Sequence, residues 1–260
     1  MYLMIADEAD QDGAKEFLVF AGVFFPAEQL LKISNSVAKL RRDFGFNETD
    51  VLKSAVGTKP KEVPAENHAK IKNAVLELAA ETDCKICCYV VPHAIAKGQK
   101  HEDRLKFGTN TLLYKFDQFL NENGKAGGLA LFDQTKDYKQ SNYLREVFAE
   151  GLPFHDGKRV HLQNIVKIET TGVGHSHLNS VADIVVGSFR FVVNEPDKDK
   201  VGAVLLKLLA KIMWGQENEN GRLAVRDRGL IIRPKTIRLD EYKADISALI
   251  DRLEQYSGAN

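Results

Sequence analysis

The chain of 260 residues is 44% hydrophobic and 28% charged, with a formal net charge of +0. These values are typical of a soluble globular protein near the upper size for one hydrophobic core. Neutrality counts against non-specific binding to phosphate backbones, and no apolar run is long enough to cross a bilayer. We therefore expect one domain over residues 1–260, with helical insertions and a C-terminal extension from about residue 197.

An antiparallel hairpin is expected to open the chain, because two β-rich runs, 2–7 and 16–25, flank a polar turn at 10–13. Pro26 ends the second run and suits the start of the helix that follows. The later strands are expected at 50–53, 84–91, 129–133, 164–169 and 230–233. The helices are expected at 26–44, 65–82, 102–121, 141–150, 177–194, 200–214 and 240–256. A hairpin followed by strands that alternate with helices indicates an α/β fold, with a mixed sheet covered by helices.

The three cysteines, Cys84, Cys87 and Cys88, lie together among β-branched and apolar residues. A zinc site usually needs a second pair of ligands at a suitable spacing, and the chain has no further cysteine. We interpret the run as a buried strand with reduced thiols. Because the chain lacks a disulfide framework and its N-terminus lacks the basic flank of a signal peptide, we expect a cytoplasmic protein with no membrane association.

Three aspartates lie at the ends or on the face of hydrophobic elements. Asp7 closes the first expected strand, Asp133 closes the strand at 129–133, and Asp183 lies inside an apolar helix pattern. Burial of a carboxylate costs free energy unless it is paired or bound to a metal. Ligands of such sheets tend to lie beyond the carboxyl ends of the strands, and a helix packed across that edge would add Asp183. Hard oxygen ligands favour Mg²⁺ or Mn²⁺ over zinc, so we predict a site for such a cation.

Three segments around these aspartates form an ordered set of motifs. The first is Ala-Asp-Glu-Ala-Asp, followed by Phe-Leu-Val-Phe-Ala-Gly-Val-Phe-Phe; the second is Leu-Phe-Asp-Gln; the third is Asn-Ser-Val-Ala-Asp-Ile-Val-Val-Gly-Ser-Phe-Arg. Over residues 1 to about 195 their order and spacing resemble the domain-of-unknown-function 3800 family. That family opens on Asp-Glu-Ser-Gly, and its third aspartate lies in a helix segment usually written Gln-hydrophobic-Ala-Asp.

This resemblance implies a ribonuclease H-like fold with a metal-dependent nuclease centre. By position, Asp7, Asp133 and Asp183 match the family's three aspartates, and Glu8 matches the glutamate beside the first of them. The chain departs from the family pattern where Ala-Asp replaces Ser-Gly after Glu8, and where Ser180 replaces the helix glutamine.

The fourth carboxylate of the centre is not fixed by the motifs. Ribonuclease H-like enzymes commonly add a glutamate from the first helix, but Glu28 stands only at the very start of that helix. Glu8 is the substitute. Neighbouring residues in a regular strand point to opposite faces, so Asp7 and Glu8 face the site together only if the strand breaks at Asp7.

Each aspartate also has a purely structural interpretation. Asp7 and Glu8 suit a junction between a strand and a turn. Asp133 suits a cap on the turn before the next helix. Asp183 suits a pair with Arg190, although a separation of seven residues puts the two side chains two helical turns apart.

Weaker candidates lie outside the aspartate set. His175 and His177, just before the Asp183 helix, suit a general acid, a phosphate contact or an extra ligand, or else are loop histidines at a helix start, which we favour. Lys53, in the expected strand at 50–53, is either a contact to a phosphate or a solvated surface lysine, and we favour the second interpretation. Glu169 ends an expected strand and ranks below the aspartates.

A basic segment follows near the C-terminus. It contains Arg222, Arg226, Arg228, Arg233, Lys235 and Arg238. The planar guanidinium fork suits phosphate, so the segment lines a path for nucleic acid or pairs with acidic helices such as the one near Asp240. The leading hypothesis is a metal-dependent nuclease or phosphodiesterase. The alternative is a non-catalytic ribonuclease H-like protein that binds nucleic acid or a protein partner.

Overall fold

The computed structural model describes residues 1–9, 16–96, 98–134, 138–154, 157–172, 174–195, 197–219, 221 and 223–257. The expected turn at 10–13 and Arg222 of the basic segment lie outside these residues. The strands are β1 (Tyr2–Ala9), β2 (Phe17–Pro26), β3 (Lys85–Pro92), β4 (Gly128–Asp133), β5 (Leu152–Pro153), β6 (Arg159–Val160), β7 (Ile165–Thr171), β8 (Gln216–Glu217), β9 (Leu223–Ala224) and β10 (Leu230–Ile232). The α-helices are α1 (Leu30–Asp43), α2 (Ala65–Glu81), α3 (His93–Ala96), α4 (His101–Glu122), α5 (Tyr138–Glu150), α6 (His177–Asn194), α7 (Asp199–Ile212) and α8 (Asp240–Ser257).

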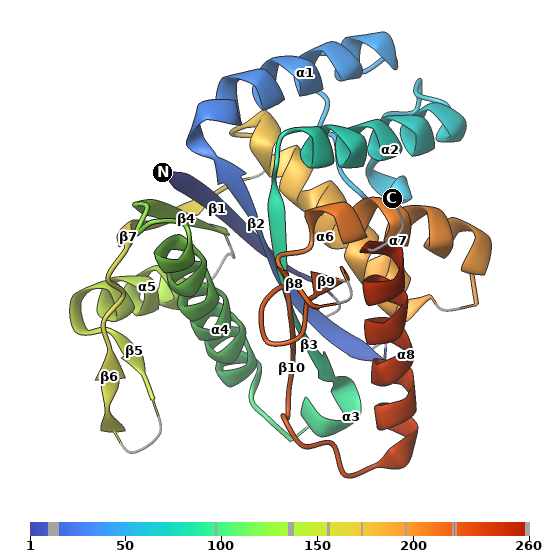
Figure 1. Ribbon diagram of the computed structural model, residues 1–260. Helices are drawn as coiled ribbons and strands as arrows, with labels where there is room; N and C mark the ends of the chain where they lie inside the picture. Colours follow the sequence, from blue (N-terminus) through green and yellow to red (C-terminus); the bar gives the residue numbers. More distant parts are fainter. Residues whose placement is uncertain are drawn as a thin grey trace.

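A six-stranded mixed sheet forms the centre of the fold, in the order β10-β3-β2-β1-β4-β7. β2 pairs antiparallel with both β1 and β3, whereas β4 pairs parallel with β1, β7 with β4, and β10 with β3. The carboxyl ends of β1, β3, β4, β7 and β10 therefore lie at one edge of the sheet. This mixed sheet, opened by an antiparallel hairpin and flanked by helices, confirms the predicted α/β fold class (Figure 1).

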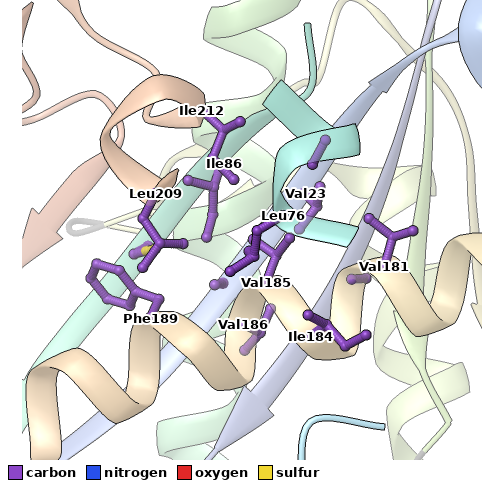
Figure 2. Close-up of a cluster of buried hydrophobic side chains, with 14 of the residues drawn as sticks. Val23, Leu76, Ile86, Val181, Ile184, Val185, Val186, Phe189, Leu209 and Ile212 are labelled. Carbon is purple, nitrogen blue, oxygen red and sulfur yellow. The ribbon is translucent and has the colours of Figure 1, made fainter. Parts of the chain in front are cut away.

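Helices cover both faces of the sheet. Residues of α1, α2, α6, α7 and α8 share one buried cluster, and residues of α4 and α5 share the other (Figure 1). Figure 2 shows apolar side chains of α6, among them Val181, Val185 and Phe189, beside Leu76 of α2 and Leu209 of α7. Burying one such side chain contributes about 1.5–3 kcal/mol, so the hydrophobic core holds α6 against the sheet.

The sequence prediction of α6 is confirmed at both ends. The helix runs from His177 to Asn194, and the hydroxyl of Ser176 accepts a hydrogen bond from the amide of Leu178 at 3.0 Å. This is the expected N-cap, which satisfies one of the amides that a helix start leaves without a partner. The cap fixes where the helix begins, and the apolar face then sets which side chains turn toward the sheet.

The expected strand at 50–53 is wrong. Residues 51–53 form a loop without strand pairing. The third strand along the chain is β3, which begins at Lys85. The apolar pattern at Val51 and Leu52 is real, because Leu52 is fully buried, but it packs into the core from a loop. A short apolar run does not distinguish a strand from a buried loop of the same length.

The cysteine run lies where the sequence analysis placed it. Cys87 and Cys88 belong to β3, Cys84 directly precedes it, and all three are buried and free of disulfides. Burial raises the pKa of Cys84 to about 11 and that of Cys87 to about 12. The thiolate is the form that binds metals, so these side chains remain neutral thiols of the core. Among the described residues, no helix combines the length and apolar character needed to cross a membrane.

Candidate functional site

Asp7 and Asp133 lie on neighbouring parallel strands. β1 and β4 pair up to Ala6 beside Phe132, so the next residue of each strand reaches the carboxyl edge of the sheet at the same level. Side chains alternate between the faces of a strand, and Ile5, two residues before Asp7, belongs to the core beneath α6. The register therefore directs both aspartates to the face that α6 covers.

Asp183 joins them from α6. Its neighbours Val181, Ala182 and Ile184 are buried against the sheet, which holds this turn of the helix at the strand ends. A small pocket of about 20 Å³ is lined by Asp7, Asp133 and Asp183 together. That is about the space of one water molecule or one small ion. The structure thus brings the three predicted aspartates to the lining of one pocket.

Glu8 does not share that pocket. β1 pairs with β2 in an unbroken register through Ala9, so the strand has no break at Asp7. Glu8 is not among the described residues that line the small pocket, in agreement with the alternation of side chains along a regular strand. It contributes instead to a larger cavity that also touches Asp7 and Asp183.

The carboxylates raise one another's pKa values. Burial is the largest cause of the raised pKa of Asp7. The charges of Glu8, Asp133 and Asp183 add to it, and together they raise this pKa to about 7. The amide of Glu8 donates to Oδ1 of Asp7 at 2.8 Å and opposes part of this rise. Burial and the charge of Asp133 raise the pKa of Glu8 to about 7 as well. The cluster therefore favours bound protons or a bound cation near neutral pH.

Two lysines oppose this accumulation of negative charge. Burial raises the pKa values of Asp133 and Asp183, and the charge of Lys53 lowers both. Lys53 also lines the small pocket, so it belongs to the site rather than to the solvated surface we favoured from the sequence. Lys72 of α2 is the second cation that lowers the pKa of Asp183. The sequence suggested Arg190 as the partner of Asp183.

The loop that carries Lys53 is held by side chains instead of strand pairing. The amide of Ser54 donates to Oδ2 of Asp183 at 2.5 Å, and Nζ of Lys72 donates to the carbonyl of Ser54 at 3.2 Å. His68 is buried in α2, and its Nε2 lies 2.8 Å from the carbonyl of Lys53. Burial lowers the pKa of His68, so a neutral ring donates this bond. These bonds fix Lys53 and Asp183 relative to each other.

Gly187 permits the loop to approach α6 so closely. A Cβ at this position would lie 2.2 Å from Oγ and 2.4 Å from Cβ of Ser54. We expect Gly187→Ala to displace the loop and break the bond between Ser54 and Asp183, at a cost of about 1–3 kcal/mol in urea unfolding. Alanine is intrinsically favoured over glycine in a helix, so any loss reports the clash. Adding Ser54→Gly removes both contacting atoms and should recover most of the stability; a fully stable single variant would refute this packing.

The weaker candidates have other partners. Nδ1 of His175 accepts a hydrogen bond from the amide of Gly172 at 3.3 Å, and Nδ1 of His177 lies 3.4 Å from Nη1 of Arg41. Glu169 is exposed and accepts from the amide that follows it. Neither cavity at the aspartates includes these three side chains. The structure therefore supports a position at a helix start for both histidines: His175 lies in the loop before α6, and His177 is the first residue of the helix.

The described part of the basic segment lies away from the aspartates. Arg228 forms an ion pair with Glu122 of α4 at 3.5 Å, and Nη1 of Arg233 donates to the neighbouring carbonyl of Ile232. Two strands, β3 and β2, separate β10 from β1. None of the described basic residues between 223 and 238 lines the two cavities. The sequence left open whether this segment pairs with acidic helices such as the one near Asp240. Arg228 does pair with an acidic residue of a helix, but the helix is α4.

The donor set suits a hard divalent cation by its chemistry. Carboxylate oxygens are the ligands that Mg²⁺ and Mn²⁺ prefer, and a cation would offset the repulsion that raises the pKa of Asp7. Within the described residues, no group of three or more His, Cys, Asp or Glu side chains is already arranged around a metal position. The aspartates therefore have to turn further toward one another to coordinate an ion.

Comparison with known proteins gives a distant structural likeness. No family model and no curated protein matches the chain. Among solved structures, the chain is similar to one described as the structure of the PCNA:RNase HII complex from Archaeoglobus fulgidus, with 13% sequence identity and a TM-score of 0.44. The match covers 96% of this chain and 90% of that chain.

Proposed function

We propose that the protein is a metal-dependent nuclease or phosphodiesterase of the domain-of-unknown-function 3800 family. Asp7, Asp133 and Asp183 would hold Mg²⁺ or Mn²⁺, and Glu8, which lines the adjoining larger cavity instead of the small pocket, would support them from there. The observation that carries the proposal is the convergence of three aspartates from three separate elements on one pocket of about 20 Å³.

A structural role explains this convergence poorly. Burial of carboxylates costs free energy, and repulsion between like charges adds to that cost; burial first and repulsion second raise the pKa of Asp7 to about 7. Carboxylates with strongly raised pKa values cluster at functional sites. A bound divalent cation would turn the repulsion into attraction.

The residues of the pocket suit the hydrolysis of a phosphodiester. A divalent cation held there would polarise a phosphoryl oxygen and lower the pKa of a water molecule. The aspartates would orient it at the open edge of the sheet. Lys53, fixed through its carbonyl by His68, lies where its charge would offset negative charge on a bound phosphate.

The test is cleavage of labelled oligonucleotides by the metal-free protein, with EDTA, MgCl₂ or MnCl₂ added. The substrates are DNA and RNA, each as a single strand and as a duplex, because the fold does not distinguish among these four. We expect products with Mg²⁺ or Mn²⁺ and none with EDTA. Absence of cleavage of all four substrates with either cation, or equal cleavage in EDTA, would refute the proposal.

A second candidate function is binding of nucleic acid or a protein partner without catalysis. It is favoured by the lysines, because Lys53 and Lys72 partly neutralise the carboxylates without a metal. This candidate predicts that oligonucleotide binding is the same in EDTA and in MnCl₂. The metal-dependent candidate predicts tighter binding with the cation, which would bridge the carboxylates and the phosphate.

A further inference from the structure

A second, much larger cavity adjoins the aspartates. Its volume is about 710 Å³, and it lies between α2, α6 and α7, with Ser54 to Val56 at its side. Asp7 and Asp183 line both this cavity and the small pocket, so the aspartates stand where the two meet. A ligand in the large cavity would therefore have one end at the proposed reaction centre.

Three cations from three helices line this cavity. They are Lys72 of α2, Arg190 of α6 and Lys200 of α7. Lys72 is held near the acidic end by its bond to the carbonyl of Ser54, whereas Lys200 is exposed. Cations spread over the length of a cavity that starts at carboxylates suit a ligand with several anionic groups, whose first group would meet the metal.

The remaining wall is apolar. Val56, Val201 and Val204 are 57%, 54% and 51% exposed, and Phe191 lines the cavity with them. Planar bases stack on such surfaces with little dependence on sequence. A nucleic-acid strand carries anionic phosphates along one side and flat bases along the other. The cations and the apolar wall of the cavity match these two sides.

The length of the cavity also fits a strand. Asp183, Gly187 and Arg190 follow one another along one face of α6, and all three line the cavity. Seven residues at 1.5 Å each separate Asp183 from Arg190 by about 10 Å. A cavity of this size holds a ligand of about one or two nucleotides, which suits a single strand.

We propose that this cavity binds a single-stranded segment of the nucleic acid, with phosphates at Lys72, Arg190 and Lys200 and bases against Val56, Phe191 and the valines of α7. The inference rests on the proposed function, since it assigns the strand next to the cleaved bond. It makes the protein selective for single strands or for strand ends.

The test measures binding of labelled oligothymidylate, which does not fold, and of the matching duplex by fluorescence anisotropy in EDTA. Losing one phosphate contact to a single strand lowers the slope of log K against log salt by about 0.7, or about eightfold in affinity near 50 mM salt. We expect this change for Lys200→Ala. Lys207→Ala is the matched control, because Lys207 is exposed on the same helix and does not line the cavity.

Binding of the duplex as tight as that of the single strand would overturn the inference, and so would equal effects of the two lysine substitutions. Cleavage with MnCl₂ is measured separately on the wild-type protein. Cleavage without any effect of Lys200→Ala would reject this cavity and leave the proposed function standing. A loss of binding in Lys200→Ala with no cleavage by the wild type would support the cavity and reject the proposed function.

Discussion

Asp133→Ala is expected to lower cation-dependent cleavage at least about 100-fold, because even the outer partners of metal ligands contribute 10–100-fold. It should also abolish stabilisation by the cation. A cation at about 100 times its Kd stabilises a folded protein by about 2.7 kcal/mol, which raises the melting temperature by about 5–10 °C for a chain of this size. Thermal unfolding with and without MnCl₂ measures this shift in the wild type and in the variant.

Asp43→Ala is the matched control for this loss. Asp43 is an exposed aspartate at the end of α1, far in sequence from the three site aspartates, and its substitution removes the same charge. The control should keep both cleavage and the thermal shift. An Asp133→Ala protein that retains wild-type cleavage would remove Asp133 from the centre.

Asp7→Asn is expected to stabilise the metal-free protein above pH 7. The pKa of Asp7 is raised from 3.8 to about 7, so between these values the folded protein keeps a proton that the unfolded chain has released. Stability from this group is therefore highest below about pH 4, falls as the pH rises toward 7, and stays reduced above pH 7. Asparagine keeps the oxygen that accepts from the amide of Glu8 and carries no charge, so the gain should be on the order of 2–4 kcal/mol at pH 8.

Urea unfolding in EDTA at pH 5 and pH 8 measures this gain. The difference in unfolding free energy between the two pH values should shrink in Asp7→Asn, and the variant should lose the thermal shift with MnCl₂. Asp43→Asn removes a charge at an exposed site and should change neither. A metal-free Asp7→Asn protein less stable than the wild type at pH 8 would show that the carboxylate stabilises the fold.

The sequence predicted the elements that carry the aspartates because each has a strong local signal. The apolar run before Asp133 follows two glycines, and the helix that holds Asp183 has both a cap at Ser176 and a continuous apolar face. The meeting of Asp7 and Asp133 followed from the rule that parallel strands end at one edge. The register of β1 and β4 gives this rule its physical basis here.

The loop around Lys53 escaped the same reasoning because its position depends on long-range bonds. Lys53 and Ser54 are held by His68, Lys72 and Asp183, which are 15 to 129 residues away in the chain. No local pattern records these partners, and the apolar residues before Lys53 imitate a strand. The large cavity was missed for a similar reason, since its walls join α2 and the loop at Ser54 to α6 and α7, which lie more than 90 residues further along the chain.

Calorimetric titration of MnCl₂ into the metal-free wild-type protein at pH 8 tests the central claim that the three aspartates form a cation site. We predict saturable binding that Asp133→Ala abolishes and Asp43→Ala retains. Absence of saturable binding up to millimolar Mn²⁺, or equal binding by Asp133→Ala, would contradict the metal centre.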